Sequence, residues 1–430
     1  MKEFGIGLLG FGTVGAGVIE GLQRNGDLIA ARLGVRPVLR RVADIDLKRD
    51  RGVTVDKSLL TVDANAAIDD PAVHILVELV GGTGVARTLV RRALEAGKPV
   101  VTANKALLAT FGAELFPLAA AHKTDIYFGA SVGGGIPIIR ALREGLVANR
   151  IQSIHGILNG TCNYILTHME QERLPFDDIL RDAQAKGYAE ANPALDIDGI
   201  DTAHKAVILA WLAYGIHLPV EQVRVEGIRG LAADDIRYGA NLGYRIKLLA
   251  VIKRHAQEVD VRVHPTMVPH AHMLASVHGV FNAAMVQGDL TGPTLYYGRG
   301  AGREPTASTV LGDIGDAMQN LAAGSPRRRD ATPETADPVR LMDGGEAQTR
   351  YYLRLALRDR PGTLALITSV LGRHRISLAS ALQQDENAGD YVPVVIVTHH
   401  CRESDCQAAL KEIAGLDVVG GTPVRIRIEA

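Results

Sequence analysis

Four ionisable residues lie close together in the sequence and are of the types that acid–base chemistry requires. Asp201 and Lys205 are four residues apart in a segment with helical periodicity, so their side chains project from one face toward the preceding loop. That loop contains Glu190 and Asp196. A substrate with an ammonium and a carbonyl group needs carboxylates for the first and a proton donor for the second, and this cluster supplies both. For an isolated Asp–Lys pair, a solvent-exposed contact of little consequence is the commoner interpretation.

A glycine-rich motif at the start of the chain predicts a dinucleotide site. It follows the apolar segment GIGLLG, opens a helix, and reads Gly10-Phe11-Gly12-Thr13-Val14-Gly15. Glycines permit the tight turn and let backbone N–H groups at the helix N-terminus approach a pyrophosphate. An ordinary glycine-rich loop is the alternative, but the strand, helix and second strand in register favour the cofactor.

The second predicted strand leaves the choice between NAD and NADP open. It ends at Asp44, and an acidic residue there pairs with the ribose hydroxyls of NAD. The neighbourhood is nevertheless basic, and it offers these cations for a 2′-phosphate: Arg40, Arg41, Lys48, Arg49, Arg51 and Lys57. Any one of them is more often a solvated surface charge.

The elements that must position these residues fall into three predicted domains. Residues 1–137, joined by a helix over 302–324, alternate strands and helices, which predicts a parallel sheet of the Rossmann type. Residues 138–301 mix strands over 151–158 and 261–263 with helices over 175–185, 201–212 and 236–249, and predict an α+β domain. After a polar linker over 325–349, residues 350–430 follow the order βαββαβ of a ferredoxin-like module.

The composition favours small-molecule partners. The net charge of −1 offers no case for nucleic acid, and no apolar run approaches the ~20 residues needed to span a membrane. The cysteines are too few for a disulfide framework or a zinc cage: Cys162, Cys401 and Cys406. A reducing cytoplasm is therefore the expected location.

Three segments carry a resemblance to a known family. They are VTANKA over 101–106, GILNGTCNYI over 156–165, and GYAEANPALDIDGIDTAHK over 187–205. In this order and at these spacings they resemble homoserine dehydrogenases, and the similarity covers about residues 1–322. It implies NAD- or NADP-dependent interconversion of L-aspartate 4-semialdehyde and L-homoserine, in threonine, methionine and isoleucine biosynthesis. It also implies that residues 138–301 bind substrate and form the contacts of a homodimer or homotetramer.

The resemblance assigns roles residue by residue. It makes Lys205 the proton donor to the aldehyde oxygen and the base in the reverse direction, and it places Lys105 near nicotinamide and substrate. Glu190 and Asp201 would hold homoserine, and Asp196 would orient or support the cluster. The residues expected to line the dinucleotide, beyond Gly10, Gly12 and Gly15, are Phe11, Thr13, Val14, Gly81, Gly82, Lys105, Gly187 and Gly302.

Of the sites that the family resemblance implies, a sodium site has the weakest support in this sequence. Members often bind this ion through a glutamate and nearby carbonyls in a segment resembling EASVGGGIP, whereas this chain reads GASVGGGIP over 129–137. Gly129 therefore replaces the only anionic ligand. The backbone carbonyls of Val132, Gly134 and Ile136 suit a hard cation, but the predicted site is weaker or absent.

Two alternative functions compete with this prediction. Cys162 could be the nucleophile of an aspartate-semialdehyde dehydrogenase, but the family carries a hydroxyl residue at this position, and hydride transfer needs no covalent intermediate. Cys162 is therefore predicted to be a small, partly buried residue. A nucleotide-responsive sensor without dehydrogenase activity would have no need for a proton donor such as Lys205.

The C-terminal module resembles an ACT domain. Its first strand and helix are joined by DRPGTL over 359–364, a turn typical of domains that bind amino acids between paired copies. Backbone N–H groups at such a turn are available to a carboxylate. The resemblance implies feedback regulation by L-threonine, and a purely structural dimerisation module is the alternative. Deletion of residues 326–430 would abolish threonine inhibition under the first interpretation.

Overall fold

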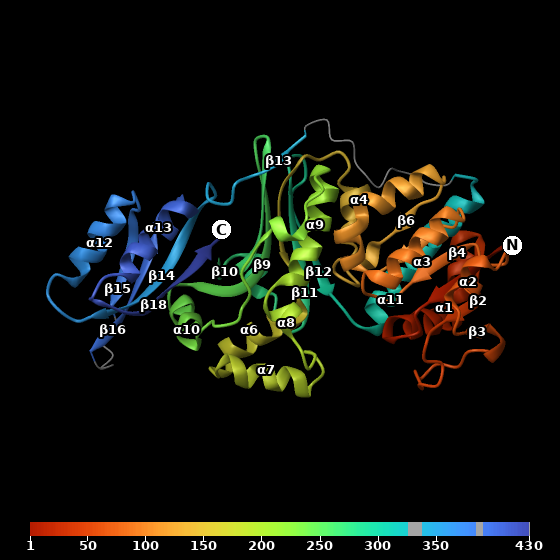
Figure 1. Cartoon of the computed structure of the whole chain (residues 1–430), viewed down its shortest axis with the longest axis horizontal. Helices are drawn as coiled ribbons and strands as arrows, with labels where there is room; N and C mark the ends of the chain where they lie inside the picture. The colour runs from red at the N-terminus through yellow and green to blue at the C-terminus, as the bar shows by residue number, and fades with distance from the viewer. Residues whose placement is uncertain (326–337, 384–389, 430) are drawn as a thin grey trace. The chain divides into compact units, whose positions relative to one another are not determined.

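The computed structural model, drawn in Figure 1, describes residues 1–325, 338–383 and 390–429. The chain divides into two compact units. The first unit comprises Met1–Gly160, Asp201–Val223 and Phe281–Val339, and the second comprises Thr161–Ile200, Arg224–Val280 and Arg340–Ala430. The segment 138–301 contributes to both units. Of the predicted linker, residues 326–337 lie outside the described residues.

A parallel sheet forms the centre of the first unit. Its strands are β1 (Lys2–Leu9), β2 (Val35–Ala43), β3 (Leu60–Thr61), β4 (Ile75–Glu78), β5 (Val100–Thr102) and β6 (Ile126–Tyr127). They run in the order β3-β2-β1-β4-β5-β6 with every pairing parallel. This is the strand order of the dinucleotide-binding fold, and the predicted Rossmann-type class is confirmed.

Helices pack around this parallel sheet, and glycines allow α1 and α11 to pack closely against each other. The helices are α1 (Thr13–Leu33), α2 (Ala64–Asp69), α3 (Gly84–Glu95), α4 (Lys105–Ala121), α5 (Ile138–Arg140) and α11 (Arg303–Ala322). A Cβ atom at Gly17 of α1 would lie 2.7 Å from the Arg303 carbonyl oxygen, and one at Gly21 would lie 2.5 Å from Leu311 Cδ1. Apolar residues of α11, including Val310 and Ile314, share the core of the sheet. The helix that follows residue 301 thus packs on the first 130 residues.

The rest of the first unit consists of three antiparallel strands and a buried helix. The strands are β7 (Ile151–Ile157), β11 (Phe281–Gly288) and β12 (Gly292–Arg299), with β11 between the other two. Helix α9 (Ile200–Tyr214) is buried along most of its length. Its aromatic residue Trp211 packs on Phe116 and Phe128 with ring centroids 4.3 and 5.8 Å away.

In the second unit, a long antiparallel hairpin corrects one sequence prediction. Strands β9 (Tyr244–His255) and β10 (Glu258–Pro269) pair along their whole length, and the helices are α6 (Gly160–Glu172), α7 (Phe176–Ala185), α8 (Ala194–Ile197) and α10 (Ala233–Asn241). The helix predicted over 236–249 is therefore wrong beyond residue 241. Gly243 has a φ of +84°, which ends the helix, and the buried run 246–252 is a strand. A short apolar run has no periodicity that separates a buried strand from a buried helix.

The predicted βαββαβ module forms the C-terminal part of the second unit. It consists of β14 (Gln348–Arg358), α12 (Thr363–Arg373), β15 (Leu378–Gln383), β16 (Tyr391–Thr398), α13 (Glu403–Ala414) and β18 (Val419–Ile428). These strands pair antiparallel in the order β18-β14-β16-β15, and the two helices cover one face of the sheet (Figure 1). Apolar side chains from both helices and the strands form its own core.

Strand β18 also pairs with β10, in parallel, at Thr266↔Arg427 and Met267↔Ile428. The C-terminal module and the hairpin β9–β10 therefore belong to one sheet. Three two-residue strands flank it: β8 (Arg224–Val225), β13 (Arg340–Leu341) and β17 (Cys401–Arg402). Among the described residues, no helix has the length and hydropathy of a transmembrane segment.

Candidate active site

Two lysines contact the same carboxylate in the first unit. Lys205 Nζ lies 2.6 Å from Asp201 Oδ2, and Lys105 Nζ lies 3.0 Å from Asp201 Oδ1. Lys205 also donates to the Leu158 carbonyl oxygen at 2.6 Å, and Asn159 Nδ2 donates to Asp201 Oδ2 at 2.9 Å. Asp201 and Lys205 are buried, so the solvated-pair interpretation of their spacing is wrong.

The charge of Asp201 is set by these neighbours. Burial alone would raise the pKa of the Asp201 carboxyl, but the charges of Lys205 and Lys105 and the hydrogen bonds from Lys205 and Asn159 hold it far below its usual range. Asp201 is therefore an anion at neutral pH. An anion in this position attracts the two lysine side chains that contact it and holds them on either side of its carboxylate.

Three elements bring these side chains together. Asp201 and Lys205 lie one turn apart on α9, as the four-residue spacing predicts. Asn159 follows the end of β7, and Lys105 is the first residue of α4. Asn104 caps α4, because its Oδ1 accepts from Leu107 N at 3.1 Å, and this cap sets the position from which Lys105 extends.

The glycine-rich motif forms the turn between β1 and α1 that a pyrophosphate requires. Gly10 has a φ of +99°, and a Cβ atom at Gly15 would lie 2.2 Å from the Gly10 carbonyl oxygen, so neither position accepts a side chain without strain. A Cβ atom at Gly12 would meet nothing within 4 Å. The motif thus leaves open space at the N-terminus of a 21-residue helix, which fits a dinucleotide phosphate.

Asp44 is oriented by the same turn. Its Oδ2 accepts from Phe11 N at 2.6 Å, and its Oδ1 accepts from Asp46 N at 2.8 Å. Arg51 lies over the Phe11 ring at 4.7 Å and 3.5 Å from Asp44. Of the other candidate cations, Arg40 and Arg41 form ion pairs with carboxylates, whereas Lys48 and Arg49 are exposed.

The loop over Gly81 and Gly82, predicted to line the dinucleotide, depends on a carboxylate that the sequence prediction did not include. Glu78, fully buried at the end of β4, accepts from Val80 N at 2.9 Å and Gly81 N at 3.0 Å. Its other oxygen accepts from the Thr102 hydroxyl at 2.6 Å. Asn104 Nδ2 donates to the Gly82 carbonyl at 2.7 Å. In the sequence, the signal for Glu78 was an acidic residue at the end of an otherwise apolar strand. Asn159 was also missed, and its signal was an amide side chain within the motif over 156–165.

The remaining predicted substrate residues belong to the second unit and are described within it. The Thr161 hydroxyl donates to Asp196 Oδ2 at 3.2 Å, and Cys162 Sγ lies 3.1 Å from the Asp196 carbonyl oxygen. Cys162 is fully buried rather than partly buried as predicted. Gly187 has a φ of +75°, and the Gln184 amide donates to the Glu190 carbonyl at 3.1 Å, which leaves the Glu190 carboxylate exposed.

The segment around Gly129 fits a sodium ion poorly. Thr309 Oγ1 donates to the Gly134 carbonyl at 2.7 Å and Ile138 N donates to the Ile136 carbonyl at 2.8 Å, so two of the three predicted ligands already have partners. A Cβ atom at residue 129 would lie 2.8 Å from Asp313 Oδ1, so a larger side chain needs Asp313 to move. Among the described residues, no group of three His, Cys, Asp or Glu side chains has a geometry suited to a metal.

Comparison with known proteins identifies the family. Three family models match this chain. The model described as "Homoserine dehydrogenase, NAD binding domain" matches residues 10–129, and the model described as "Homoserine dehydrogenase" matches residues 137–314. The model described as "ACT domain" matches residues 351–417. A homoserine dehydrogenase of Pseudomonas aeruginosa is 42% identical over 438 residues and covers 100% of this chain and 99% of its own. This chain belongs to the homoserine dehydrogenase family.

Solved structures of this family have the same fold. A homoserine dehydrogenase from Thiobacillus denitrificans aligns with a TM-score of 0.94 and 44% identity, over 100% of this chain and 99% of its own. A hyperthermophilic archaeal homoserine dehydrogenase in complex with NADPH aligns with a TM-score of 0.63 and 27% identity, over 76% of this chain and 100% of its own. The protein is accordingly an NAD(P)-dependent oxidoreductase, and the alternatives of a thioester-forming enzyme and a sensor without activity are set aside.

Proposed function

We propose that Lys205 gives a proton to the aldehyde oxygen of L-aspartate 4-semialdehyde and takes it back from L-homoserine in reverse. An ammonium carries three N–H donors, and the contacts to the Leu158 carbonyl and to Asp201 use two of them. The third can serve a substrate oxygen. The contact of the buried Lys205 side chain with Asp201 is the observation that carries this proposal, since it fixes the direction in which the donor points.

The reaction divides between cofactor and protein. When bound, the nicotinamide supplies a hydride to the aldehyde carbon or accepts one from the alcohol. In reduction, the electron pair of the C=O bond moves to oxygen, and the proton from Lys205 Nζ completes the hydroxyl group. Asp201 holds Lys205 in place, and the second ammonium, at Lys105, adds positive charge where negative charge develops on the substrate oxygen.

The ammonium group of the substrate, at the other end from the aldehyde, needs negatively charged partners. Glu190 and Asp201 are proposed to bind this ammonium group. Asp196, which accepts a hydrogen bond from Thr161, is proposed to orient or support this cluster. The positive φ of Gly187 suits a close approach of backbone to the cofactor. In the first unit, Gly302 at the start of α11 completes the proposed lining of the dinucleotide.

The test is oxidation of L-homoserine by the full chain with NAD and with NADP. Lys205→Ala is expected to lower kcat by a factor on the order of 10² to 10⁴ with cofactor binding retained. Lys205→Arg keeps the charge but not the activity, because a guanidinium does not release its proton. Lys411→Ala, an exposed lysine of α13, is the control. An intact chain that oxidises no homoserine would refute the proposal.

Both cofactors remain candidates for this chain. Asp44 favours NAD through the ribose hydroxyls, whereas Arg51, together with the exposed Lys48 and Arg49, offers cations to a 2′-phosphate. Comparison of kcat/KM for the two cofactors, in the wild type and in Arg49→Ala, tests which groups decide. A selective loss with NADP would assign the phosphate to this side chain.

The ACT module is proposed to bind an amino acid, with L-threonine as the candidate effector. The turn over 359–364 is exposed except for Thr363, and it leads into α12, where backbone N–H groups suit a carboxylate. The chain is further proposed to form a homodimer or homotetramer, which sedimentation equilibrium with and without L-threonine would measure. Purely structural dimerisation predicts no change in activity on adding L-threonine.

Catalysis is proposed not to depend on sodium. Gly129 offers no carboxylate, and the carbonyls of Gly134 and Ile136 already accept hydrogen bonds, so a cation gains little there. Equal kcat in sodium and in tetramethylammonium chloride at the same ionic strength is expected. A specific sodium activation would contradict this proposal.

A further inference from the structure

Two cysteines of the C-terminal module flank the start of helix α13. Cys401 belongs to β17 and directly precedes Arg402, the N-cap residue, and Cys406 is the fourth residue of the helix. The residue before an N-cap and the fourth residue of the helix commonly pack against each other and fix the angle at which the chain enters the helix. Here both positions carry a thiol, and the two thiols share a hydrogen bond.

The surroundings of this pair differ for its two members. Cys406 is fully buried, whereas Cys401 keeps 7% of its surface exposed. Both side chains belong to the apolar core of the module, and the Thr398 hydroxyl lies 4.0 Å from Cys401 Sγ. The hydrogen bond between the thiols lowers the pKa of Cys401 and, together with burial, raises that of Cys406. A small oxidant therefore reacts with Cys401 first, and Cys406 is the second thiol beside it.

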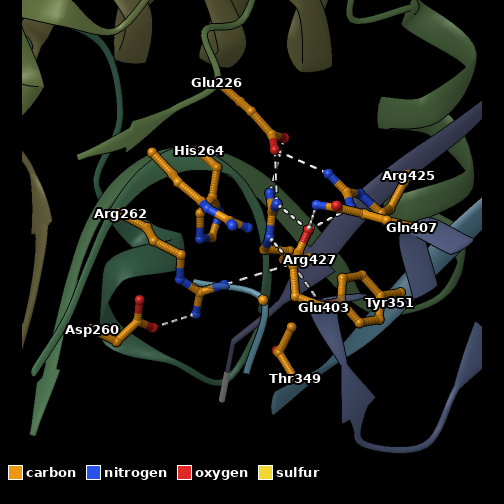
Figure 2. A network of polar contacts seen from close by, with 12 residues as sticks. Glu226, Asp260, Arg262, His264, Thr349, Tyr351, Glu403, Gln407, Arg425 and Arg427 are labelled. Atoms are coloured by element: carbon orange, nitrogen blue, oxygen red, sulfur yellow. Dashed lines mark hydrogen bonds and ion pairs between the residues drawn. The ribbon is translucent and has the colours of Figure 1, made fainter. Parts of the chain in front are cut away.

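A carboxylate between the two cysteines is the centre of a buried polar network (Figure 2). Glu403, which has no exposed surface, accepts from the Tyr351 hydroxyl at 2.7 Å and from Arg427 at 2.7 and 2.8 Å. Gln407 Nε2 donates to it at 2.9 Å, and Arg425 forms an ion pair with it. Such a network holds each member in one place.

Arg427 extends this network from the last strand of the chain to the segment after β8. Its guanidinium also donates to Glu226 at 2.7 and 2.9 Å, so it bridges two carboxylates. Burial alone would raise the pKa of the Glu403 carboxyl, but hydrogen bonds from Arg427 and the charges of Arg427 and Arg425 lower it to about 2. Glu403 is therefore an anion at neutral pH, and its displacement would leave a buried guanidinium short of a partner.

We propose that Cys401 and Cys406 are a peroxide-sensitive modification site, which closes to a disulfide and thereby displaces Glu403 from its partners. The thiolate of Cys401 attacks one oxygen of hydrogen peroxide, the O–O bond breaks, and the hydroxide that leaves takes up the proton released by Cys401. The Cys406 sulfur then attacks the sulfenic acid at Cys401, the S–O bond breaks, and the second hydroxide takes up the Cys406 proton. The thiols give up two electrons, and peroxide becomes two molecules of water.

The disulfide acts on Glu403 because it shortens the distance across the start of the helix. A disulfide bond of ~2.05 Å is much shorter than the hydrogen-bonded contact of two thiols, so Cys401 and the first turn of α13 must approach each other. Glu403 is the first residue of that turn, and its N–H donates to the Ala347 carbonyl at 2.8 Å. Movement of the turn changes the direction in which the Glu403 carboxylate points toward Tyr351 and Arg427.

The first test treats the full native chain with hydrogen peroxide and maps its peptides without a reductant. One disulfide is expected, between Cys401 and Cys406, and the thiols titrated after denaturation should fall from three to one. Glutathione, a monothiol, should restore all three. Cys162 is the internal control: it is fully buried, its Sγ lies 3.1 Å from the Asp196 carbonyl oxygen, and it should stay reduced. A chain that keeps its thiols, or that forms any other oxidation product instead, would overturn the proposal.

The second test measures hydrogen–deuterium exchange in β14 and β18, the strands that carry Tyr351 and Arg427. Exchange is expected to be severalfold faster in the oxidised than in the reduced wild type, because the loss of buried contacts favours local opening. Cys406→Ser keeps a side chain of similar size but forms no disulfide, so peroxide should not accelerate its exchange. If this variant does not fold, the oxidised wild type after reduction by glutathione is the control. An oxidised wild type that exchanges like the reduced chain would overturn the effect on Glu403.

Discussion

At the scale of single residues, Asp201 organises the site because both lysines and Asn159 converge on its carboxylate. The contact of a buried anion with two cations is worth more than an exposed pair, since little solvent screens it. Removing the anion leaves the buried side chain of Lys205 without its carboxylate partner. The two oxygens of Asp201 therefore each hold one lysine of the site.

Replacement of Asp201 by asparagine tests this organisation. Asp201→Asn keeps the shape but removes the charge, so kcat for homoserine oxidation is expected to fall by a factor on the order of 10². Asp69→Asn, which breaks an exposed pair with Arg92, is the matched control. The measurement is the initial rate at saturating NADP or NAD. Activity equal to that of the control would show that the charge of Asp201 is dispensable.

The residue-scale features differ in how far the sequence predicts them. The contact of Asp201 with Lys205 follows from a spacing of four on a helix, so local geometry predicts it. Lys105 is 96 positions before Asp201, and only family resemblance placed it near the site. Glu78 and Asn159 were missed, because their importance lies in backbone groups and side chains that come together only when the sheet and α9 pack.

At the scale of elements, helix α11 is tied to the segment after β6 by one buried acid. Asp313 Oδ2 accepts from Gly129 N at 2.8 Å. Burial, partly offset by this hydrogen bond, raises the pKa of the Asp313 carboxyl to about 7, and the charge of Asp316 adds to the increase. This residue lies in the wall of a cavity of about 430 Å³. The contact therefore includes a group that gains charge near neutral pH.

The pH dependence of stability follows from that shift. Between pH 4 and 7 the unfolded chain has lost the Asp313 proton while the folded chain retains it, so stability falls as pH rises. Asp313→Asn is expected to reduce this fall by about 2 kcal/mol between pH 5 and 7. The sole tryptophan, Trp211, reports urea unfolding of the first unit. Asp27→Asn, a highly exposed site, should leave the dependence unchanged. An identical slope in Asp313→Asn would contradict the assignment.

Elements were predictable where the periodicity was long or the caps were clear. The βαββαβ order and the Rossmann alternation are confirmed. The sequence predicts them because amphipathic helices lie between distinct apolar strands. The helix predicted over 236–249 failed at Gly243, because the buried run after it has no polar face to reveal a period of two. The pairing of β18 with β10 lies beyond any local pattern, since it joins segments about 160 residues apart.

At the scale of the whole chain, the two compact units cut across the predicted substrate domain, which contributes segments to both. The C-terminal module shares buried charges with the rest of the second unit. Arg354 and the Tyr352 hydroxyl bind Asp235 of α10 at 2.6 and 3.0 Å, in addition to the network around Arg427. Deletion of residues 326–430 would therefore expose or unpair these groups. A truncated chain is expected to lose activity as well as regulation, so it cannot test the effector by itself.

A point variant in the turn before α12 is the better test of regulation. Gly362 has a φ of +89° and lies exposed at the N-cap of α12, so alanine there strains the backbone by about 1 to 2 kcal/mol and turns the N–H groups proposed to bind the effector. Gly362→Ala is expected to raise the L-threonine concentration for half-inhibition severalfold, with each activity normalised to that of the same variant without threonine. Gly372→Ala, within α12, is the control. An effector couples to the active site only through contacts that differ between the two states of the protein. Equal threonine sensitivity in both variants would therefore show that L-threonine, if it acts on this chain, does not bind at this turn.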